Sequence, residues 1–272
     1  MAFDKKILAD SFVAKLIESQ SIFSKMNRTF DPLVRQGASS VDIPNLAIPE
    51  VKTAGTPLVD ASRKKTHTDT TMVNIPLTKY AVPLADELLG AYESNGTLLT
   101  EYINSSVMVL QEKLDALTIA AAQATTDKTA FGAASMAWGD IIDINKRFDV
   151  NKVPKAGRVI VVDANLAAEF FGIDVIKNAV SYNSNFLTTG TMLQFMGNTF
   201  FITGVAPTIT IASAQKYTMV GIYGPGLAVI INKMGDIKEA WDSVNLQTVY
   251  DVICHAGVGL FDNKFAVVKY KP

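Results

Sequence analysis

The sequence predicts an α+β protein with an extended two-stranded ribbon, one long helix and an α/β unit that follows them in the chain. Three observations lead to this prediction. Apolar residues alternate over two proline-containing segments, at about 41–51 and 70–80. An apolar stripe with helical spacing then runs from Leu99 to Ala121. Beyond it, residues 136–235 alternate between strand-like and helix-like patterns.

The first segment, residues 4–19, is predicted to be an amphipathic helix. Leu8, Phe12 and Leu16 are spaced four residues apart, with Val13 and Ile17 beside them. The apolar stretch that follows has no clear period. We therefore expect an arm that lies on another surface rather than a compact subdomain.

The ribbon is predicted from alternation with a period of two. In its second segment Val73, Ile75 and Leu77 share one face, while Met72 and Asn74 share the other. The polar stretch between the two segments, residues 52–69, has the composition of a loop. This pattern indicates an antiparallel ribbon with a long tip.

Prolines mark both segments of the ribbon. Pro44 and Pro49 lie in the first segment and Pro76 lies in the second. Because proline removes a donor from the strand ladder, these positions indicate exposed edges. A two-stranded ribbon is marginally stable alone, so it needs a surface to lie on, and we expect a neighbouring subunit to supply one.

The long helix is predicted to begin near Thr97 and to end near Gln123. At ~1.5 Å per residue such a helix is about 40 Å long, which suits a spine on which other elements pack. Its stripe advances by three or four residues at each step, through Leu99, Ile103, Val107, Leu110, Leu114, Leu117 and Ala121.

The following unit is predicted to contain a short helix at 137–149, a fully buried strand at Val159–Val162 and a helix at 164–171. Two further groups of strands, each interrupted by glycines, are expected at 190–205 and 217–232. The chain then ends in two β segments joined near residues 262–264.

Composition suggests that part of the surface is buried against other chains. Hydrophobic residues make up 49% of the sequence and charged residues 19%, whereas soluble proteins average about 25% charged. No apolar run is long enough to cross a membrane, and the N-terminus lacks the apolar core of a signal peptide. The net charge is −1, and no basic run is longer than Arg63–Lys65. The sequence therefore lacks the cluster of basic residues that binding to duplex nucleic acid requires.

Few residues are available for chemistry. Two histidines and one cysteine cannot supply the four ligands of a structural zinc site. Cys254 and His255 are adjacent in a predicted strand, so their side chains point to opposite faces. His67, in the polar loop, is a conceivable distant partner. We interpret Cys254 as a core residue and His255 as facing solvent or an interface.

Other apparent motifs also have structural interpretations. The segment Gly221–Gly226 lacks the lysine and hydroxyl residue of a phosphate loop and is predicted to be a turn between strands. Asp140 and Asp143 are assigned to surface pairing with Lys146. The basic segment 63–69 is assigned to a solvated loop tip. Three aromatic residues are assigned to the core: Phe195, Phe200 and Phe201. We therefore predict no catalytic, cofactor-binding or metal site and no enzymatic activity.

The order of these elements resembles the major capsid proteins of tailed bacteriophages, which have the Hong Kong 97-type fold. The resemblance covers nearly the whole chain, although each motif is loose. It rests on these stretches: SVDIPNL, NIPLTKYAVPLADELL, LLTEY, EKLDALTIAAA, FDVNKVPKAGRVIVVD, GTMLQFMGNTFFITG and AGVGLFDNKFAVVKY.

The resemblance implies a division of the chain. Residues 1–36 would be the N-terminal arm and 37–83 the extended loop that overlaps a neighbouring subunit. The peripheral domain would combine 84–135, with its spine helix, and the returning β segment 236–272. The inserted axial α/β domain would be 136–235.

The implied function is a structural subunit that assembles as hexamers and pentamers into an icosahedral capsid around double-stranded DNA. The implied place is the virion, with assembly in the host cytoplasm. Expected partners are further copies of the chain, a separate scaffolding protein, a portal and decoration proteins, with only weak non-specific contact to packaged DNA and no membrane. Some family members cross-link a lysine to an asparagine, but no motif here singles out Lys64, Lys65, Lys79 or Asn263.

Three rival interpretations remain open on the sequence. An encapsulin-like compartment shares the fold and would enclose cargo enzymes instead of a genome. A soluble oligomeric enzyme would use Cys254 as its nucleophile. A tail-tube or decoration protein would lack the long helix predicted here.

Overall fold

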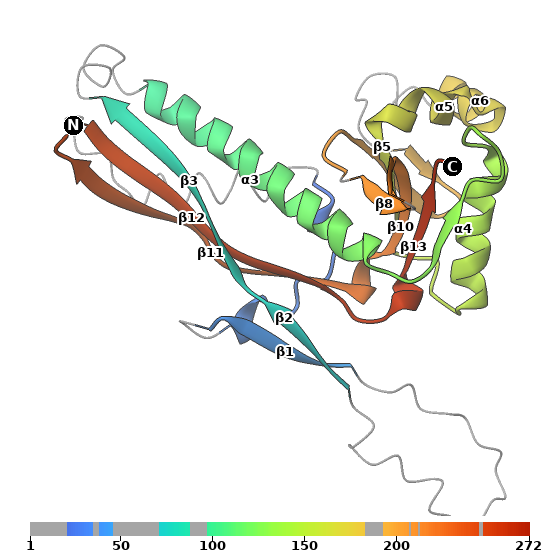
Figure 1. Ribbon diagram of the computed structural model, residues 1–272, viewed down its shortest axis with the longest axis horizontal. Coiled ribbons are helices and arrows are strands. Elements are labelled where there is room, and N and C mark those ends of the chain that lie inside the picture. Colours follow the sequence, from blue (N-terminus) through green and yellow to red (C-terminus); the bar gives the residue numbers. More distant parts are fainter. Residues whose placement is uncertain are drawn as a thin grey trace, which may run out of the picture.

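The computed structural model describes residues 21–34, 38–45, 71–87, 97–182, 193–206, 208–211, 213–244 and 247–272. The molecule is elongated (Figure 1). A compact unit with helices α4, α5 and α6 occupies one end, and the long helix α3 runs beside the strands β3, β11 and β12 toward the other. The ribbon β1–β2 crosses beneath these strands. The expected helix at 4–19 lies outside the described residues.

The ribbon forms as predicted. Strand β1 (Ser40–Asn45) pairs antiparallel with β2 (Thr71–Pro76), and Val41 lies opposite Ile75. Ile75 is buried, whereas Met72 is exposed, which confirms the two faces inferred from alternation. The two strands form a sheet by themselves, so each has a free edge where its proline is tolerated. Pro49 and the polar tip lie outside the described residues.

The ribbon is shorter than predicted, because the chain changes its partner strand after Pro76. The second segment was expected to remain in the ribbon to residue 80, within a loop ending at 83. Instead β3 (Thr78–Glu87) leaves β1 and pairs antiparallel with β12 (Gln247–Leu260), which also pairs with β11 (Leu227–Asp242). The alternation continues across Leu77, so period alone does not reveal that the partner strand changes.

Helix α3 (Thr97–Gln123) has the predicted length. Val107, Leu110 and Leu114 are buried, in agreement with the predicted stripe. Beyond them the buried face rotates to Thr118, Ile119 and Ala122, whereas Leu117 and Ala121 are only partly buried. The rotation follows from packing, because α3 contacts β3 and β12 along part of its length and β10 and β13 along the rest.

The compact unit is built on a six-stranded mixed sheet with the order β4-β13-β10-β5-β7-β6. Every residue of β5 is buried, as predicted for the run Val159–Val162. The strands are β4 (Lys128–Ala130), β5 (Arg158–Asp163), β6 (Leu193–Phe195), β7 (Asn198–Thr203), β10 (Thr218–Tyr223) and β13 (Ala266–Tyr270).

Each face of this sheet buries a separate core. Val159 and Val161 face α3 and the segment 21–34, whereas Ile160 and Val162 face Phe148 and its neighbours. The covering helices on that second face are α4 (Trp138–Val150), the turn η5 (Ala164–Leu166) with α5 (Ala167–Gly172), and α6 (Asp174–Tyr182).

Short elements complete the fold. The segment interpreted as a turn, Gly221–Gly226, contains the end of β10 and the 3-10 turn η6 (Gly224–Gly226) that leads into β11, which confirms that interpretation. The remaining elements are the 3-10 turns η1 (Phe23–Lys25), η2 (Asp31–Leu33) and η7 (Asn263–Phe265), and the hairpin of β8 (Ile209–Ile211) with β9 (Ala214–Lys216).

The two C-terminal strands belong to different sheets. Residues 236–272 were expected to return together to the peripheral domain, but β13 pairs with β10 and β4 in the six-stranded sheet. The expected boundary at 235/236 falls inside β11, which is one strand of 16 residues. The two sheets are therefore joined by continuous chain rather than by a linker.

Candidate assembly surfaces

The apolar face of the ribbon is covered by its own chain. Ile43 and Ile75 form a small core with Ala228 and Ile230 of β11. Ile43, Ile75 and the two β11 residues are each 1% exposed or less. We expected this face to wait for a neighbouring subunit; for the described part of the ribbon that expectation is wrong.

Two glycines of β12 make the seat for the ribbon. A Cβ on Gly257 would lie 2.4 Å from the carbonyl oxygen of Pro76, and one on Gly259 would lie 2.6 Å from Ile75. Both distances are far inside van der Waals contact, so only glycine lets the ribbon backbone cross this closely. Both glycines lie in the stretch AGVGLFDNKFAVVKY, but no local pattern in the sequence indicates this role.

The segment 21–34 forms a strap over the junction of the two sheets. Asn27 forms a parallel bridge with Ala228, donating its N–H to the carbonyl of Leu227 (3.1 Å) and accepting from Val229 N (3.0 Å). The carboxylate of Asp31 accepts from the N–H of Ile231 at 3.0 Å. These backbone contacts fix the exit direction of the chain toward the ribbon.

Asp115 ties the strap to α3. Its Oδ1 accepts from the N–H of Phe23 at 2.9 Å. Burial raises the pKa of the Asp115 carboxyl to about 6, although hydrogen bonds from the backbone of Phe23 and Ile22 act in the opposite direction. Phe23 itself is 1% exposed, so the strap is part of the core.

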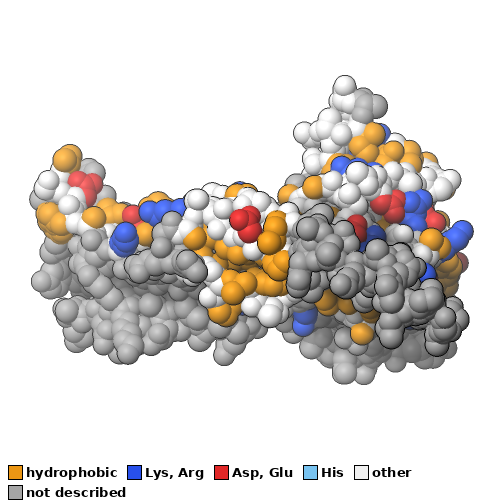
Figure 2. Space-filling view, turned by 90° about the horizontal axis from the view of Figure 1, so that it is seen from below, with side chains coloured by type: hydrophobic (Ala, Val, Ile, Leu, Met, Phe, Trp, Pro, Cys, Tyr) orange, Lys and Arg blue, Asp and Glu red, His pale blue; other side chains and the backbone are white. Residues whose placement is uncertain are grey.

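Large apolar side chains are exposed in several places, including the compact unit, where Val150 and Met196 are 71% and 53% exposed. Met72 and Leu33 are 65% and 57% exposed near the ribbon, and Met108 is 64% exposed on α3. Trp241 and Val244, at the end of the β11–β12 hairpin, are 52% and 86% exposed. Figure 2 shows hydrophobic side chains gathered midway along the lower face of the molecule, in the region of the ribbon. Such exposed apolar patches are typical of contact surfaces.

Cys254 lies inside the core, as expected, and the described residues give it no catalytic setting. It is fully buried on the side of β12 that faces α3, and burial raises the pKa of its thiol to about 11. His255 points to the opposite face of the strand and lies opposite Lys79 in β3. A buried, protonated thiol is a poor nucleophile, which disfavours the rival enzyme interpretation. His67 lies outside the described residues.

The acidic pair on α4 has a different partner from the one expected. Lys269 of β13 places its Nζ 2.7 Å from Asp143 and 3.5 Å from Asp140, and Arg147 also contacts Asp143. Pairing with Lys146 was therefore wrong. Burial opposes ionisation of Asp143, but hydrogen bonds from Lys269 and Arg147 outweigh it and lower the pKa of that carboxyl.

Asp140 serves mainly as a structural cap. It is 4% exposed, and its two carboxylate oxygens accept from the N–H groups of Gly132 (3.1 Å) and Ala137 (2.9 Å). Together with Lys269 it fastens the C-terminal strand to the start of α4. No local signal in the sequence marks Lys269, because its partners are more than a hundred residues away in the chain.

A second buried cation organises the end of α4. Arg158 is 2% exposed, and its guanidinium donates to Asp149 (2.7 Å) and to the carbonyl of Pro154 (2.9 Å) while lying 5.2 Å from the ring centre of Phe148. Asn145 and the carbonyl of Val153 accept its remaining hydrogen bonds. All of these contacts are internal to the compact unit, so they stabilise it rather than forming a ligand site.

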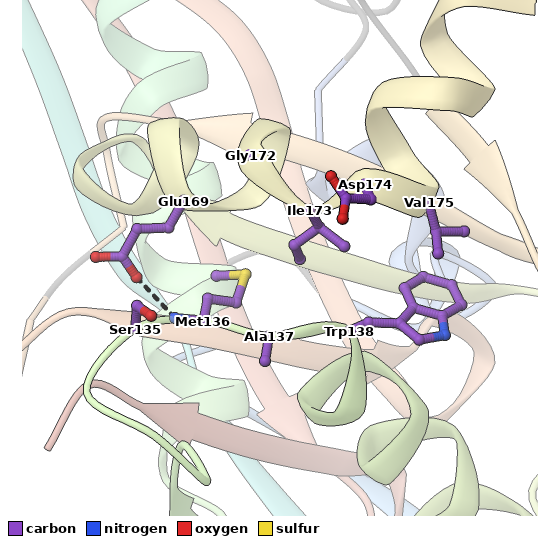
Figure 3. A pocket seen from close by; sticks show the side chains of 9 residues that line it. All are labelled: Ser135, Met136, Ala137, Trp138, Glu169, Gly172, Ile173, Asp174 and Val175. Carbon is purple, nitrogen blue, oxygen red and sulfur yellow. Dashed lines mark hydrogen bonds between the residues drawn. The ribbon is translucent and has the colours of Figure 1, made fainter.

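One open pocket lies between the start of α4 and the α5–α6 corner (Figure 3). Trp138, Ile173 and Val175 supply its apolar wall. Glu169 turns away to accept from the N–H of Met136 at 2.8 Å and pairs with Lys271. These contacts occupy the carboxylate of Glu169, and the pocket shows no convergent set of catalytic groups.

The described residues contain no cluster of three or more metal-ligating side chains, and none of their helices is long and apolar enough to span a membrane.

The outcomes for the remaining predicted residues differ. Phe200 and Phe201 are buried as expected, whereas the side chain of Phe195 is not among the described ones. Of the cross-linking candidates, Lys79 lies exposed in β3 and Asn263 begins η7. Lys64 and Lys65 lie outside the described residues.

Comparison with known proteins gives a fold and no sequence family. No family model and no curated protein matches the sequence. Many solved structures match with low identity, and three of them show the range of proteins concerned. The capsid of cyanophage P-SCSP1u has 13% identity and a TM-score of 0.60, covering 92% of this chain and 88% of that one. A virus-like particle from Pyrococcus furiosus has 10% identity and a TM-score of 0.62, covering 97% and 98%. The SrpI encapsulin complex of Synechococcus elongatus has 8% identity and a TM-score of 0.56, covering 86% and 82%.

The chain has the Hong Kong 97-type fold. The resemblance inferred from the order of its segments is thereby confirmed at the level of fold. Phage capsids, a virus-like particle and an encapsulin all match, so the kind of shell is not determined by the Hong Kong 97-type fold.

Proposed function

We propose that this chain is a structural subunit of an icosahedral protein shell, and that the shell is the capsid of a tailed bacteriophage enclosing double-stranded DNA. The observation that carries the proposal is the likeness to shell structures over 86–97% of the chain. The matches also cover 82–98% of the other chains, so the comparison is with nearly whole subunits. A structural role also accounts for the scarcity of residues for chemistry.

We further propose that copies of the chain form hexamers and pentamers. The compact unit on the six-stranded sheet, which includes β13, would be the axial domain around the symmetry axes, and α3 with β3, β11 and β12 would be the peripheral domain. Within the arm (1–36) and the loop (37–83), the strap at residues 21–34 and the strands β1 and β2 pack on their own subunit, and the tip at 52–69 would reach a neighbouring subunit. The exposed hydrophobic side chains near the ribbon and at the β11–β12 hairpin are then contact surfaces between copies.

A nearly neutral chain suits this role. The net charge of −1 limits repulsion between many closely packed copies and gives the inner wall little general affinity for DNA. Scaffolding, portal and decoration proteins are the partners we propose, with the virion as the place of the assembled shell.

An encapsulin-like compartment is the alternative, favoured by the match to the encapsulin complex from Synechococcus elongatus. The two functions differ in what the shell contains. A phage capsid isolated from its natural source would hold DNA, with strong absorbance at 260 nm, whereas a compartment would hold a protein cargo. Nuclease-protected DNA of uniform length would support the phage function.

The first test is negative-stain electron microscopy of the purified protein with light scattering on the same sample. Closed shells, hexamers with pentamers, or curved sheets are expected. A monodisperse dimer or tetramer that does not assemble even with an added scaffolding protein would contradict the shell proposal.

The second test targets the loop of the ribbon. Replacing residues 52–69 with a short turn should leave a folded, soluble subunit that cannot close a shell, because the anchoring strands β1 and β2 are seated within the subunit. Circular dichroism would check folding, and electron microscopy would check assembly. Normal particles from this variant would refute the proposed role of the loop. A matched control replaces the same eighteen residues with a flexible linker of equal length, which separates loss of reach from loss of specific contacts.

A further inference from the structure

The compact unit carries an exposed patch at the end where α4 finishes. Because β5 and β7 run parallel from Arg158 and Asn198, the loop before β5 and the turn before β7 lie at this same end of the six-stranded sheet. We call the region the α4 end patch, which consists of four exposed residues: Val150, Lys152, Lys155 and Met196. Val150 and Met196 are 71% and 53% exposed, more than any other large apolar side chain described in this unit.

The backbone of the α4 end patch is strained at two positions. Lys152 and Met196 have φ angles of 56° and 52°, and Ser213 is the only other described non-glycine residue with a positive φ. Met196 and Gly197 are the two central residues of the β6–β7 turn, and a turn with positive φ at both positions favours asparagine before glycine. Methionine is costly there. An exposed apolar side chain at a strained position indicates a role in contact rather than in folding.

The charges around the patch are mostly positive. Lys152 and Lys155 are exposed, and so is Lys146, one turn before the end of α4. The acidic residue of this last turn, Asp149, is paired with the buried Arg158 at 2.7 Å. The patch therefore presents two apolar side chains beside ammonium groups, and it fits a surface that is apolar with a carboxylate at its edge.

The opposite end of α4 carries such a surface. The open pocket lies between the first turn of α4 and the corner where α5 meets α6 (Figure 3). Its apolar wall contains Trp138, Ile173 and Val175, and Val175 is 38% exposed. Asp174, between the two apolar residues of the corner, is exposed as well.

Asp174 is the carboxylate of this pocket that a partner could use. Glu169, the other one, is paired with Lys271 and accepts from the N–H of Met136. Lys177, one turn beyond Asp174 on α6, is also exposed, so the corner is not uniformly acidic. We therefore assign the ionic part of a contact here to Asp174 alone.

We propose that the α4 end patch of one copy of the chain docks in the pocket at the α5–α6 corner of the next copy. Met196 would lie against Trp138 and Val175, and Lys152 would approach Asp174. A second copy is the occupant because each chain carries both surfaces, at opposite ends of one helix. Such a head-to-tail contact can close into rings. The inference rests on the proposed shell function, since it names a contact by which compact units would form hexamers and pentamers.

The strained turn gives a test in which stability and assembly change in opposite directions. Met196→Asn should raise the midpoint of urea unfolding of the subunit, because asparagine suits the turn. It should also lower the fraction of assembled protein severalfold in sedimentation, because the apolar contact is lost. Ser213→Asn, which relieves the same kind of strain in the β8–β9 turn, is the control and should leave assembly unchanged. A Met196→Asn variant that assembles like the unaltered protein would overturn the proposal.

A charge exchange tests the ionic part. Lys152→Glu and Asp174→Lys should each weaken assembly, and the two changes in one chain should restore it, because the pair is then reversed rather than broken. Lys128→Glu lies in β4, at the other edge of the sheet from β6, so it should not rescue Asp174→Lys. Failure of the exchange to restore assembly, or equal rescue by Lys128→Glu, would contradict the pairing.

Cross-linking separates the failure of this contact from the failure of the shell function. A chain with both Met196→Cys and Val175→Cys, treated with a short bismaleimide, should give a ladder of covalent oligomers on a denaturing gel, whereas either single variant should give none. Cys254 is buried and should not react. Particles of the unaltered protein without a ladder from the double variant would overturn the contact and leave the shell function standing. Dimers from a single variant would overturn it in favour of a two-fold contact, and the absence of both particles and ladder would contradict both proposals.

Discussion

The two sheets of this protein reach stability in different ways. The six-stranded sheet has both faces covered by elements of the same chain: α3 and the strap on one, α4, α5 and α6 on the other. The three-stranded sheet has α3 on one face, and on the other, among the described residues, the ribbon covers the end near Gly257 and Gly259. The first sheet therefore has a core on each face, whereas the second depends on the close crossing of the ribbon.

This difference fits a subunit whose compact unit holds its shape while its extended part meets other copies. Mutations in the six-stranded sheet should therefore weaken global folding. Mutations at the crossings should loosen local elements and leave the compact unit intact. Three variants, taken from the largest expected effect to the smallest, test this contrast.

The largest effect is expected from Phe148→Ala in the compact unit. Phe148 is fully buried, lies against the gap left by Gly221 and packs beneath Arg158. Removing a buried phenylalanine costs about 3–5 kcal/mol, so the midpoint of urea unfolding should fall steeply. Val150→Ala, on the same helix but 71% exposed, is the control and should change the midpoint little. Equal effects from the two variants would contradict the role assigned to this core.

A smaller and local effect is expected from Gly257→Ala. The added Cβ would meet the carbonyl oxygen of Pro76 at 2.4 Å, a contact with backbone that no side-chain rotation relieves. Overpacking of this kind costs about 1–3 kcal/mol, and moving the ribbon away is the simplest relief. Hydrogen exchange should rise in β1 and β2 and stay unchanged in β5.

The control for that variant is Gly132→Ala, because a Cβ on Gly132 would meet no atom within 4 Å. It should leave exchange in the ribbon at the level of the unaltered protein. Faster exchange in β5 with Gly257→Ala would mean that the ribbon seat and the six-stranded sheet unfold as one unit, and the contrast between the sheets would fail.

The smallest effect concerns the strap and depends on pH. Burial raises the pKa of Asp115 to about 6, so the folded state binds a proton more tightly than the unfolded state does. The contribution of this group to the free energy of unfolding is complete below about pH 4, the ordinary pKa of an aspartate. It is lost as the pH rises through 6. Asp115→Asn keeps an oxygen acceptor for Phe23 without the buried charge.

The Asn variant should therefore be more stable than the unaltered protein at pH 8, by about 1 kcal/mol once the partial exposure of the side chain is allowed for. The difference should shrink between pH 6 and pH 4. Urea unfolding at several pH values measures it. A variant that is less stable at pH 8 would show that the charge of Asp115, rather than its oxygen, holds the strap.

Local patterns in the sequence were sufficient for most of the elements. Alternation placed Ile75 and Met72 on opposite faces of the ribbon, the apolar stripe gave α3 its length, and a run of β-branched residues gave β5. Each of these signals is carried by residues close together in the chain, where the period of a strand or helix decides which side chains face inward. The burial of Cys254 followed in the same way.

Only the tertiary structure decided how distant segments meet. It seated the ribbon on Gly257 and Gly259 of the same chain, paired Lys269 with Asp143, and sent β13 to the six-stranded sheet while β12 remained with β3. None of these contacts has a local period, because each joins residues more than a hundred positions apart or depends on two backbones approaching closely. The sequence by itself determined the elements and their inward faces, whereas long-range packing decided which surfaces the subunit covers itself and which it leaves for others.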